Sequence, residues 1–388
     1  MNLVDRSGLV ARVRDLHRIY PVVALLGVRQ VGKTTLAAIY AERFKGPTCR
    51  FDLEDARDLR RLHDPYLALE PRRGLIVLDE IQRRPELFPA LRVLSDRAGG
   101  SARFLVLGSA SPTLLRQSSE SLAGRVAFVA LPGFSIAETG VDRWQRLWLR
   151  GGMPRSFLAR TERESFDWRR NMVETYLERE LPALDVSIAA PTIRRFWTML
   201  AHYHGQTWNG AELARSFGVS EKTVKSYLDL LCATYLAQRL TPWHANPGKR
   251  EVKSPKVFLT DSGIVHSLLG IADADELQGH PKVGASFEGF AIRQVIDRLG
   301  AKPDECHSWG IHGGSSLDLL VVRGNRRLGF EMKHTSAPDY TTSARHAKEF
   351  LRLDSLDIVH AGDRTWPVAD GVRALSIRDV WTELDPIP

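Results

Sequence analysis

Eight residues near the start of the chain have the types and spacing needed to bind the phosphates of a nucleoside triphosphate. They read Gly27-Val28-Arg29-Gln30-Val31-Gly32-Lys33-Thr34 and fit the pattern G-x-x-x-x-G-K-[ST] at every fixed position. A loop of this kind directs backbone N–H groups and a helix dipole at one anion. We expect it, with Thr35, to bind ATP. Lys33 would reach the β- and γ-phosphates, and the Thr34 hydroxyl would bind Mg²⁺.

The segments on either side of this loop are those that such a site requires. Residues 21–26 are mostly apolar and are typical of a buried strand, and residues 35–40 are typical of the first turns of a helix. A strand that runs through a glycine loop into a helix places the N–H groups of the loop at the helix N-terminus. A chance glycine loop is the alternative, and the flanking strand and helix weigh against it.

Two acidic residues supply the other half of an ATP-hydrolysing centre. Residues 74–78 read as another buried strand, which ends in Asp79-Glu80. Ligands gather at the carboxyl ends of parallel strands, so both acids are expected beside the phosphate loop. Asp79 would hold Mg²⁺ through water or Thr34, and Glu80 would polarise the attacking water.

Ser109 and Arg125 are two further candidates. Ser109 follows an apolar strand at residues 104–108 and could sense the γ-phosphate, although a simple strand-to-loop turn is the alternative. Arg125 lies on the next loop and could contact the γ-phosphate of a neighbouring subunit, which would imply a homo-oligomer. Pairing of Arg125 with a local carboxylate is the other interpretation.

The chain resembles a known family over almost its whole length. The matching residues are the phosphate loop, Leu78-Asp79-Glu80-Ile81-Gln82, Gly108-Ser109, Ser121-Leu122-Ala123-Gly124-Arg125, Gly151-Gly152-Met153-Pro154 and Lys256-Val257-Phe258-Leu259-Thr260-Asp261-Ser262-Gly263. They are similar to prokaryotic AAA-type P-loop ATPases that carry a C-terminal domain of unknown function. The resemblance implies an α/β ATPase domain that uses ATP, and it implies little about the biological role.

The middle of the chain has the pattern of a DNA-binding helix-turn-helix. In residues 209–228, Asn209 can cap a first helix, Gly218 allows a left-handed turn, Ser220 can cap a second helix, and Val224 can pack into the core. Lys222 and Lys225 would be exposed on the second helix. Lys249, Arg250, Lys253 and Lys256 follow in a basic segment that could be a wing contacting DNA phosphates. A purely structural lid is the alternative.

The last third of the chain contains a degenerate nuclease-like pattern. Glu288 lies on a predicted helix and Asp318 near the start of a predicted strand. Glu331 and Lys333 share one face of the next strand, which a two-residue turn at Gly324-Asn325 would join to the first. The order resembles the PD-(D/E)xK nucleases, in which three acids bind Mg²⁺ and the lysine activates water. An ion pair on a solvated strand face is the alternative.

Composition and length limit the remaining choices. The chain has 388 residues, a net charge of +8 and three widely spaced cysteines, which fit a multidomain protein with a polyanionic partner in a reducing cytoplasm. No apolar run is long enough to span a membrane. We predict an α/β fold of four parts: an AAA-type ATPase domain (1–140), a helical lid (141–205), a winged helix-turn-helix (206–275) and a nuclease-like domain (280–388).

Three functions are compatible with these features. The leading hypothesis is a DNA-associated ATPase with a nuclease-like C-terminal domain. The second is a nucleotide-gated regulator that binds DNA or a protein partner and has an inactive nuclease fold. The third is a signalling or scaffold ATPase with no nucleic-acid role. Salt-dependent DNA binding would exclude the third, and metal-dependent cutting would separate the first two.

Overall fold

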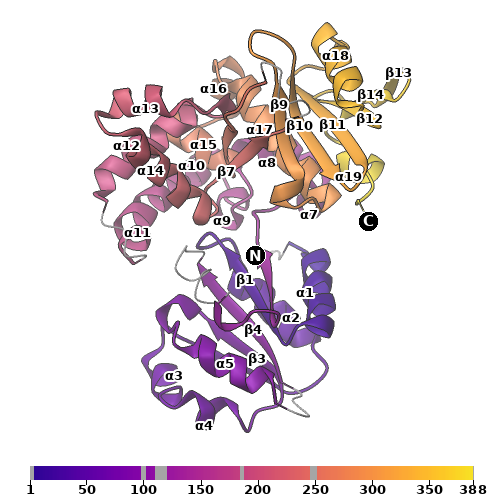
Figure 1. Ribbon diagram of the computed structural model, residues 1–388. Helices are drawn as coiled ribbons and strands as arrows, with labels where there is room; N and C mark the ends of the chain where they lie inside the picture. The colour runs from indigo at the N-terminus through magenta and orange to yellow at the C-terminus, as the bar shows by residue number, and fades with distance from the viewer. Residues whose placement is uncertain (1–3, 98–101, 110–119, 184–187, 245–250, 388) are drawn as a thin grey trace. The chain divides into compact units, whose positions relative to one another are not determined.

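The computed structural model describes residues 4–97, 102–109, 120–183, 188–244 and 251–387, and the chain forms two compact units (Figure 1). Unit 1 comprises Met1–Gly133 with Ala233–Tyr235, and unit 2 comprises Phe134–Cys232 and Leu236–Pro388. Across the described residues, none of the helices combines the length and the apolar character needed to cross a membrane.

Unit 1 is built on a five-stranded parallel sheet in the order β2-β3-β4-β1-β5. The strands are β1 (Val22–Gly27), β2 (Thr48–Asp52), β3 (Gly74–Asp79), β4 (Ala102–Ser109) and β5 (Val126–Ala130). The helical segments are α1 (Ser7–Ile19), α2 (Lys33–Arg43), α3 (Ala56–Arg61), α4 (Pro65–Leu69), η1 (Ile81–Arg83) and α5 (Leu87–Ser95). β1 and β3 are buried along their whole length, as expected for central strands of a parallel sheet covered on both faces.

The strand order brings the predicted site residues of unit 1 to one edge of the sheet. β4 lies between β1 and β3, and Gly27 at the end of β1 is level with Ser109 at the end of β4. Asp79 at the end of β3 is level with Asp52 on β2. The phosphate loop, the acidic pair and Ser109 therefore follow neighbouring strand ends, where α/β folds bind ligands.

Unit 2 combines a helical region with a large sheet. Its helical segments are α7 (Ile136–Thr139), η2 (Val141–Arg143), α8 (Trp144–Arg150), α9 (Pro154–Phe157), α10 (Glu162–Thr175), the π-helical η3 (Tyr176–Glu180), α11 (Leu181–Ala183), α12 (Ala190–His202), α13 (Gly210–Phe217), α14 (Glu221–Ala233), α15 (Ser262–Leu269), α16 (Ala274–Gly279), α17 (Val283–Leu299), η4 (Pro303–Glu305), α18 (Thr342–Leu351) and α19 (Val380–Glu383).

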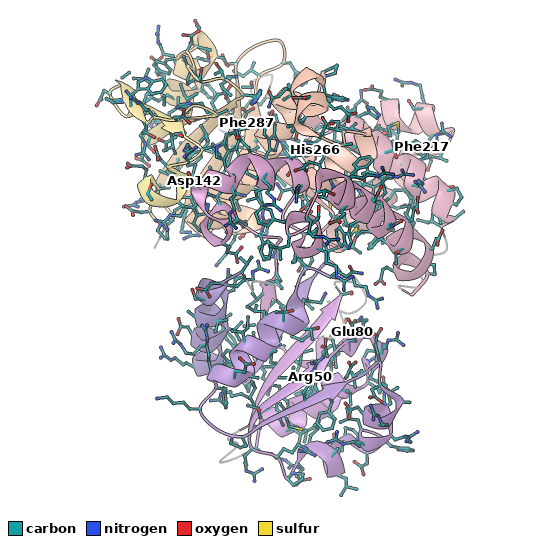
Figure 2. All side chains as sticks on the ribbon, turned by 180° about the vertical axis from the view of Figure 1, so that it is seen from behind. Arg50, Glu80, Asp142, Phe217, His266 and Phe287 are labelled. Carbon is teal, nitrogen blue, oxygen red and sulfur yellow. The ribbon has the colours of Figure 1, made fainter. Side chains whose placement is uncertain are left out.

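A buried polar network ties three of these helices together. His266 on α15 lies 2.8 Å from the carbonyl oxygen of Leu149 and 2.6 Å from the Ser286 hydroxyl on α17, while Trp148 on α8 donates to the same hydroxyl at 2.9 Å. Burial lowers the pKa of His266 to about 3, so the ring is neutral at physiological pH. His266 and Phe287, both fully buried in unit 2, are labelled in Figure 2.

One nine-stranded mixed sheet runs through unit 2 in the order β13-β14-β12-β11-β10-β9-β7-β8-β6. Its strands are β6 (Gln206–Thr207), β7 (Ala237–Pro242), β8 (Lys256–Leu259), β9 (Cys306–Gly310), β10 (Ser316–Arg323), β11 (Arg326–Lys333), β12 (Ser355–His360), β13 (Trp366–Ala369) and β14 (Val372–Ser376). The sequence prediction separates residues 206–275 from 280–388. In the structure a short parallel pairing of β7 with β9, Thr241 opposite His307, joins strands from both ranges.

The helix-turn-helix residues adopt the local geometry that the sequence predicts. The Asn209 side chain accepts the N–H of Glu212 at 3.2 Å, and Gly218 has a φ of 69° at the end of α13. Ser220 caps α14 by accepting the N–H of Thr223 at 3.1 Å, and Val224 is fully buried. Three strands, β6, β8 and β7, pair beside the two helices in antiparallel order.

The hairpin of the C-terminal third also forms as predicted. β10 and β11 pair with Arg323 opposite Arg326, so Gly324-Asn325 is the two-residue turn, and Gly324 has a φ of 59°. α17 packs against both strands. This places Glu288 on the helix over the strands that carry Asp318 and Glu331.

Candidate functional site

The phosphate loop of unit 1 is shaped by two glycines. Gly27 ends β1 where an added Cβ would lie 2.7 Å from the carbonyl oxygen of Leu131, so no larger residue fits there. Gly32 has a φ of 98°, a left-handed conformation that favours glycine, and α2 begins at the next residue, Lys33. The helix N-terminus therefore opens directly onto the loop.

Lys33 is held over this loop. Its side chain is buried, and its ammonium group donates to the carbonyl oxygens of Gly27 at 3.0 Å and Val28 at 3.1 Å. Arg29, also in the loop, pairs with Glu54 at 3.5 Å. The loop thus presents a buried ammonium group and a helix N-terminus to the same point, which suits the β- and γ-phosphates of ATP.

Thr34 and Asp79 meet as a pair that fits Mg²⁺. The Thr34 hydroxyl donates to Asp79 Oδ2 at 3.0 Å, although the two residues are 45 positions apart. The Arg50 guanidinium lies 2.8 Å from the same carboxylate oxygen, and the Glu80 N–H donates to the other oxygen at 3.1 Å. A hydroxyl beside a carboxylate is the oxygen donor set that Mg²⁺ uses at phosphate sites, and Arg50 must share or leave Asp79 for the ion to bind there.

Glu80 is held in an unusual position. Its φ of 58° is left-handed, a conformation that costs a non-glycine residue roughly 1–3 kcal/mol and is found mainly at functional sites. Gln82 donates its side-chain amide to Glu80 and accepts the N–H of Ser109 at 3.3 Å. Burial raises the pKa of Glu80, which strengthens it as a base. Arg50 and Glu80 are labelled on unit 1 in Figure 2.

Ser109 stands where a ligand contact is expected. Its hydroxyl oxygen is buried, and no hydrogen-bond partner for it lies among the residues that the structure describes. Buried polar groups usually have a partner, so this hydroxyl is well placed for a phosphate or a water molecule. Its role as a γ-phosphate sensor stays a prediction.

Arg125 lies at the amino-terminal ends of the strands, opposite the carboxyl ends that carry the phosphate loop. It precedes β5, and its carbonyl accepts the N–H of Val22 at the start of β1, about 17 Å along the strand from the phosphate loop. Its guanidinium pairs with Asp96 at 2.8 Å and donates to the carbonyl of Ala123 at 2.9 Å. The structure thus has the local ion pair that was the alternative interpretation, and Arg125 cannot reach the phosphates of its own subunit.

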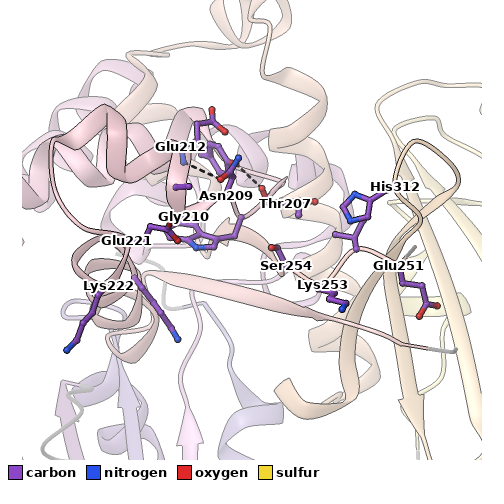
Figure 3. A pocket seen from close by; sticks show the side chains of 15 residues that line it. Thr207, Asn209, Gly210, Glu212, Glu221, Lys222, Glu251, Lys253, Ser254 and His312 are labelled. Atoms are coloured by element: carbon purple, nitrogen blue, oxygen red, sulfur yellow. Dashed lines mark hydrogen bonds between the residues drawn. The ribbon is translucent and has the colours of Figure 1, made fainter. Parts of the chain in front are cut away.

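In unit 2, the start of α14 borders an open groove of about 980 Å³ (Figure 3). The exposed lysines Lys222 and Lys225 on α14 and Lys253 on the segment before β8 line it, together with Trp208 and His312. Glu212, Glu221 and Glu251 line it too, so the groove is mixed in charge rather than uniformly basic. Lys249 and Arg250 lie outside the described residues.

The predicted acids of the C-terminal third converge. Glu331 Oε1 accepts from Lys333 at 2.8 Å, so the two side chains share a face as predicted. Asp318 Oδ2 accepts the N–H of Met332 at 3.0 Å. The other oxygen of Asp318 accepts from Lys256 at 2.7 Å, and Glu288 accepts from the same lysine at 3.0 Å.

Burial and charge explain how these carboxylates ionise. Burial, followed by the charge of Asp318, raises the pKa of both Glu288 and Glu331. Burial alone would also raise the pKa of Asp318, but the Lys256 ammonium beside it holds that pKa below the usual value. Lys256 was predicted as part of a basic wing on DNA. Its ammonium group is engaged with Glu288 and Asp318 in this structure, so a DNA contact by Lys256 stays a prediction.

The three acids do not form a metal site in this arrangement. Within the described ranges, no group of three or more His, Cys, Asp or Glu side chains is placed to hold a metal ion. The Lys256 ammonium group bridges Glu288 and Asp318, where a bridging metal ion would lie. The metal role of Glu288, Asp318 and Glu331 therefore stays a prediction that requires Lys256 to move.

Comparison with known proteins places the chain in a family. Residues 20–140 match the family described as "AAA domain", and residues 141–275 match a "Domain of unknown function (DUF8612)". Two relatives are 48% identical over 381 residues, covering 98% of this chain and 85% of theirs: "Uncharacterized protein Rv2008c" of Mycobacterium tuberculosis (strain ATCC 25618 / H37Rv) and "Uncharacterized protein Mb2031c" of Mycobacterium bovis (strain ATCC BAA-935 / AF2122/97). The chain belongs to their family.

A solved structure is similar in fold. The Walker-type ATPase PABY2304 of Pyrococcus abyssi matches with a TM-score of 0.50 and 17% sequence identity, covering 69% of this chain and 96% of that one. Together with the AAA match, this likeness supports the predicted P-loop ATPase of AAA type.

Gln82 and Arg50 are the residues of this AAA site that sequence reasoning missed. Gln82 stands in the matched run Leu78-Asp79-Glu80-Ile81-Gln82, but no role was assigned to it. Arg50 is a charged residue on β2, and its position on a strand beside β3 was the one available signal. Arg50 contacts Asp79 only because the sheet pairs β2 with β3, whereas Gln82 contacts Glu80 two positions away in the chain.

Replacing Gln82 by alanine is expected to lower the rate of ATP hydrolysis about tenfold, because a charged group loses a hydrogen bond. The amide of Gln82 lowers the pKa of Glu80, so its loss should raise that pKa further. A base works only when ionised, so the acid limb of the kcat profile should move to higher pH. Steady-state kinetics across pH test this. A lower rate with an unshifted profile would mean that Gln82 is merely structural.

Mixing two inactive variants tests Arg125. If Arg125 acts across a subunit boundary, equal amounts of Arg125→Ala and Glu80→Gln protein should recover up to about a quarter of the wild-type rate, since that share of interfaces has both groups intact. Asp96→Asn, which breaks only the local ion pair, is the matched control and should remain active. No recovery in mixtures shown to co-assemble would contradict the role in a neighbouring subunit.

Proposed function

We propose that the chain hydrolyses ATP with Mg²⁺ in unit 1 and binds DNA through unit 2. The observation that carries the first half is the meeting of Thr34 and Asp79 at 3.0 Å beside the buried ammonium of Lys33. Two segments 45 positions apart thus bring a hydroxyl, a carboxylate and an ammonium group to the same strand ends.

Each residue of this site has a distinct task in the proposed reaction. The loop N–H groups and Lys33 bind and orient the phosphates, and Glu80 takes a proton from the attacking water. Gln82 connects Glu80 to Ser109, because its amide donates to the Glu80 carboxylate and accepts the Ser109 N–H. The buried hydroxyl of Ser109 can contact the γ-phosphate region. Mg²⁺ bound at Thr34 and Asp79 would supply charge neutralisation to the β- and γ-phosphate oxygens.

DNA binding is the proposed task of the module formed by α12, α13, α14 and the strands β6, β7 and β8. The order helix, strand, helix, helix, strand, strand is that of a winged helix-turn-helix. Lys222, Lys225 and Lys253 line its groove with exposed ammonium groups, which suits contacts to phosphates. Because acidic residues also line the groove, we expect the DNA backbone to follow the lysines and avoid the carboxylates, which gives it one defined path through the groove.

Alanine at Lys222, Lys225 and Lys253 together is expected to weaken DNA binding similarly across sequences. Removing one phosphate contact should flatten the dependence of log affinity on log salt by about one unit. A matched variant with alanine at Lys45, Lys302 and Lys348, which removes the same charge outside the groove, should keep the wild-type slope. Equal slopes in both variants, measured by fluorescence anisotropy, would place DNA elsewhere.

A second candidate function follows from Lys256. With that lysine on Glu288 and Asp318, the C-terminal fold favours a nucleotide-gated regulator that binds DNA or a partner without cutting it. Incubation of linear, single-stranded and branched DNA with Mg²⁺ or Mn²⁺, with and without ATP, separates this regulator from a nuclease. Metal-dependent cutting that Asp318→Asn abolishes supports a nuclease, and intact DNA supports the regulator.

A further inference from the structure

Lys256 occupies the centre of the acidic cluster formed by Glu288, Asp318 and Glu331. It begins β8, where its backbone pairs with Leu240 on one side and Thr207 on the other. Its side chain is 16% exposed, and the ammonium group lies 3.0 Å from Glu288 Oε1 and 2.7 Å from Asp318 Oδ1. Burial lowers the pKa of this lysine, but the two carboxylates more than offset that effect, so it stays charged.

Charge and geometry explain why this ammonium group and a divalent ion exclude each other. A divalent ion binds carboxylate oxygens at roughly 2.0–2.6 Å, so an ion bridging Glu288 and Asp318 would lie almost where the ammonium lies. Even with all three carboxylates ionised, the two ammonium groups that they face, from Lys256 and Lys333, leave one net negative charge. A divalent ion added to these would make the buried cluster positive, which is costly away from water.

One carboxylate oxygen of the cluster, Glu331 Oε2, is nevertheless available to bind a metal ion. Glu331 is 7% exposed, and its Oε2 has no hydrogen-bond partner among the described residues. A buried carboxylate oxygen that has no hydrogen-bond partner within the protein is normally bound by an ion or a water molecule. If the lysine withdrew, this oxygen and the freed oxygens of Glu288 and Asp318 would form a three-carboxylate donor set.

We propose that Lys256 is a built-in cation that blocks a divalent-metal site at Glu288, Asp318 and Glu331. The site is closed while Lys256 bridges Glu288 and Asp318, and it accepts Mg²⁺ or Mn²⁺ once the ammonium group is gone. The inference rests on the metal role predicted from the sequence for these three acids and names the contact that blocks it. On this proposal the cluster binds a metal ion only when the Lys256 ammonium group has moved away from Glu288 and Asp318.

Mn²⁺ binding by the full chain tests the block. All samples carry Asp79→Asn and contain no nucleotide, so that the ATP site contributes little Mn²⁺ binding. Lys256→Met removes the charge at nearly constant length, and Lys302→Met, at an exposed lysine outside the groove, is the matched control. We expect Lys256→Met to bind one Mn²⁺ at least about tenfold more tightly than the parent, because a competing charge has been removed. The Lys302→Met variant should bind like the parent.

The site of binding is checked by a second substitution. Adding Asp318→Asn to Lys256→Met should abolish the gained Mn²⁺ affinity. Equal Mn²⁺ affinity in the parent and Lys256→Met, or a gain that survives Asp318→Asn, would overturn the proposal. Neither result depends on DNA cutting or on ATP hydrolysis, so an absence of nuclease activity would leave the proposed block standing.

Stability provides an independent readout. Lys256→Met leaves buried carboxylates without their bridging cation, so we expect its melting temperature in a chelator to fall below that of the parent. Mn²⁺ should restore it, whereas the parent should respond little. A loss of stability that Mn²⁺ does not restore would contradict the proposal, and so would an equal rise in both proteins. Lys256→Arg, which keeps the charge, should behave like the parent.

Discussion

Glutamine in place of Glu80 is expected to leave ATP binding intact and to reduce hydrolysis by about 10²–10⁴-fold, the usual contribution of a general base. The amide has nearly the same size as the carboxylate and can still hydrogen bond to Gln82, so the loop should keep its shape. It cannot take a proton from water, so only turnover should be lost.

The measurement compares phosphate release with the affinity for a fluorescent ATP analogue. Glu42→Gln, the same substitution at an exposed position of α2, is the control and should match the wild type. Because the pKa of Glu80 is raised, wild-type turnover should decline as pH falls through that pKa, and the residual turnover of Glu80→Gln should lack this limb. Undiminished turnover in Glu80→Gln would exclude Glu80 as the base.

Alanine in place of Lys33 is expected to abolish hydrolysis and also to weaken ATP binding. Lys33 supplies the buried ammonium group that the loop directs at the phosphates. Its removal affects the ground state and the transition state together, so the affinity and the rate should both fall. Two loop carbonyls, of Gly27 and Val28, also lose their donor.

Calorimetric titration with Mg²⁺ and ATP measures this effect. Lys45→Ala, an exposed lysine shortly after the same helix, is the control and should bind like the wild type. A melting curve without nucleotide separates impaired binding from impaired folding. If a folded Lys33→Ala protein bound ATP as tightly as the wild type, the phosphate site would have to lie elsewhere.

Features set by neighbouring residues could be predicted from the sequence. The phosphate loop lies between its strand and helix, Asn209 and Ser220 cap their helices, and Gly324-Asn325 forms the two-residue turn. Each depends on backbone rules that act within a few positions, such as the left-handed freedom of Gly218. The convergence of Asp318 and Glu331 followed from the same hairpin.

Contacts made across the sheets could not be predicted in this way. Lys256 meets Glu288 and Asp318 over separations of 32 and 62 positions, and the basic run around it was the only signal in the sequence. Gln82 reaches Ser109 over 27 positions, and Arg50 reaches Asp79 over 29. Which side chains meet depends on strand order and register, and these are fixed by the packing of the whole unit.

The central proposal is that unit 1 hydrolyses ATP with Mg²⁺ and with Glu80 as the base, in a chain that also binds DNA. Steady-state phosphate release by the full chain, measured at saturating ATP and Mg²⁺, tests the hydrolysis most directly. The account predicts release that disappears in a chelator and in Glu80→Gln. Release that persists in a chelator, or that the Glu80→Gln protein shows equally, would contradict it.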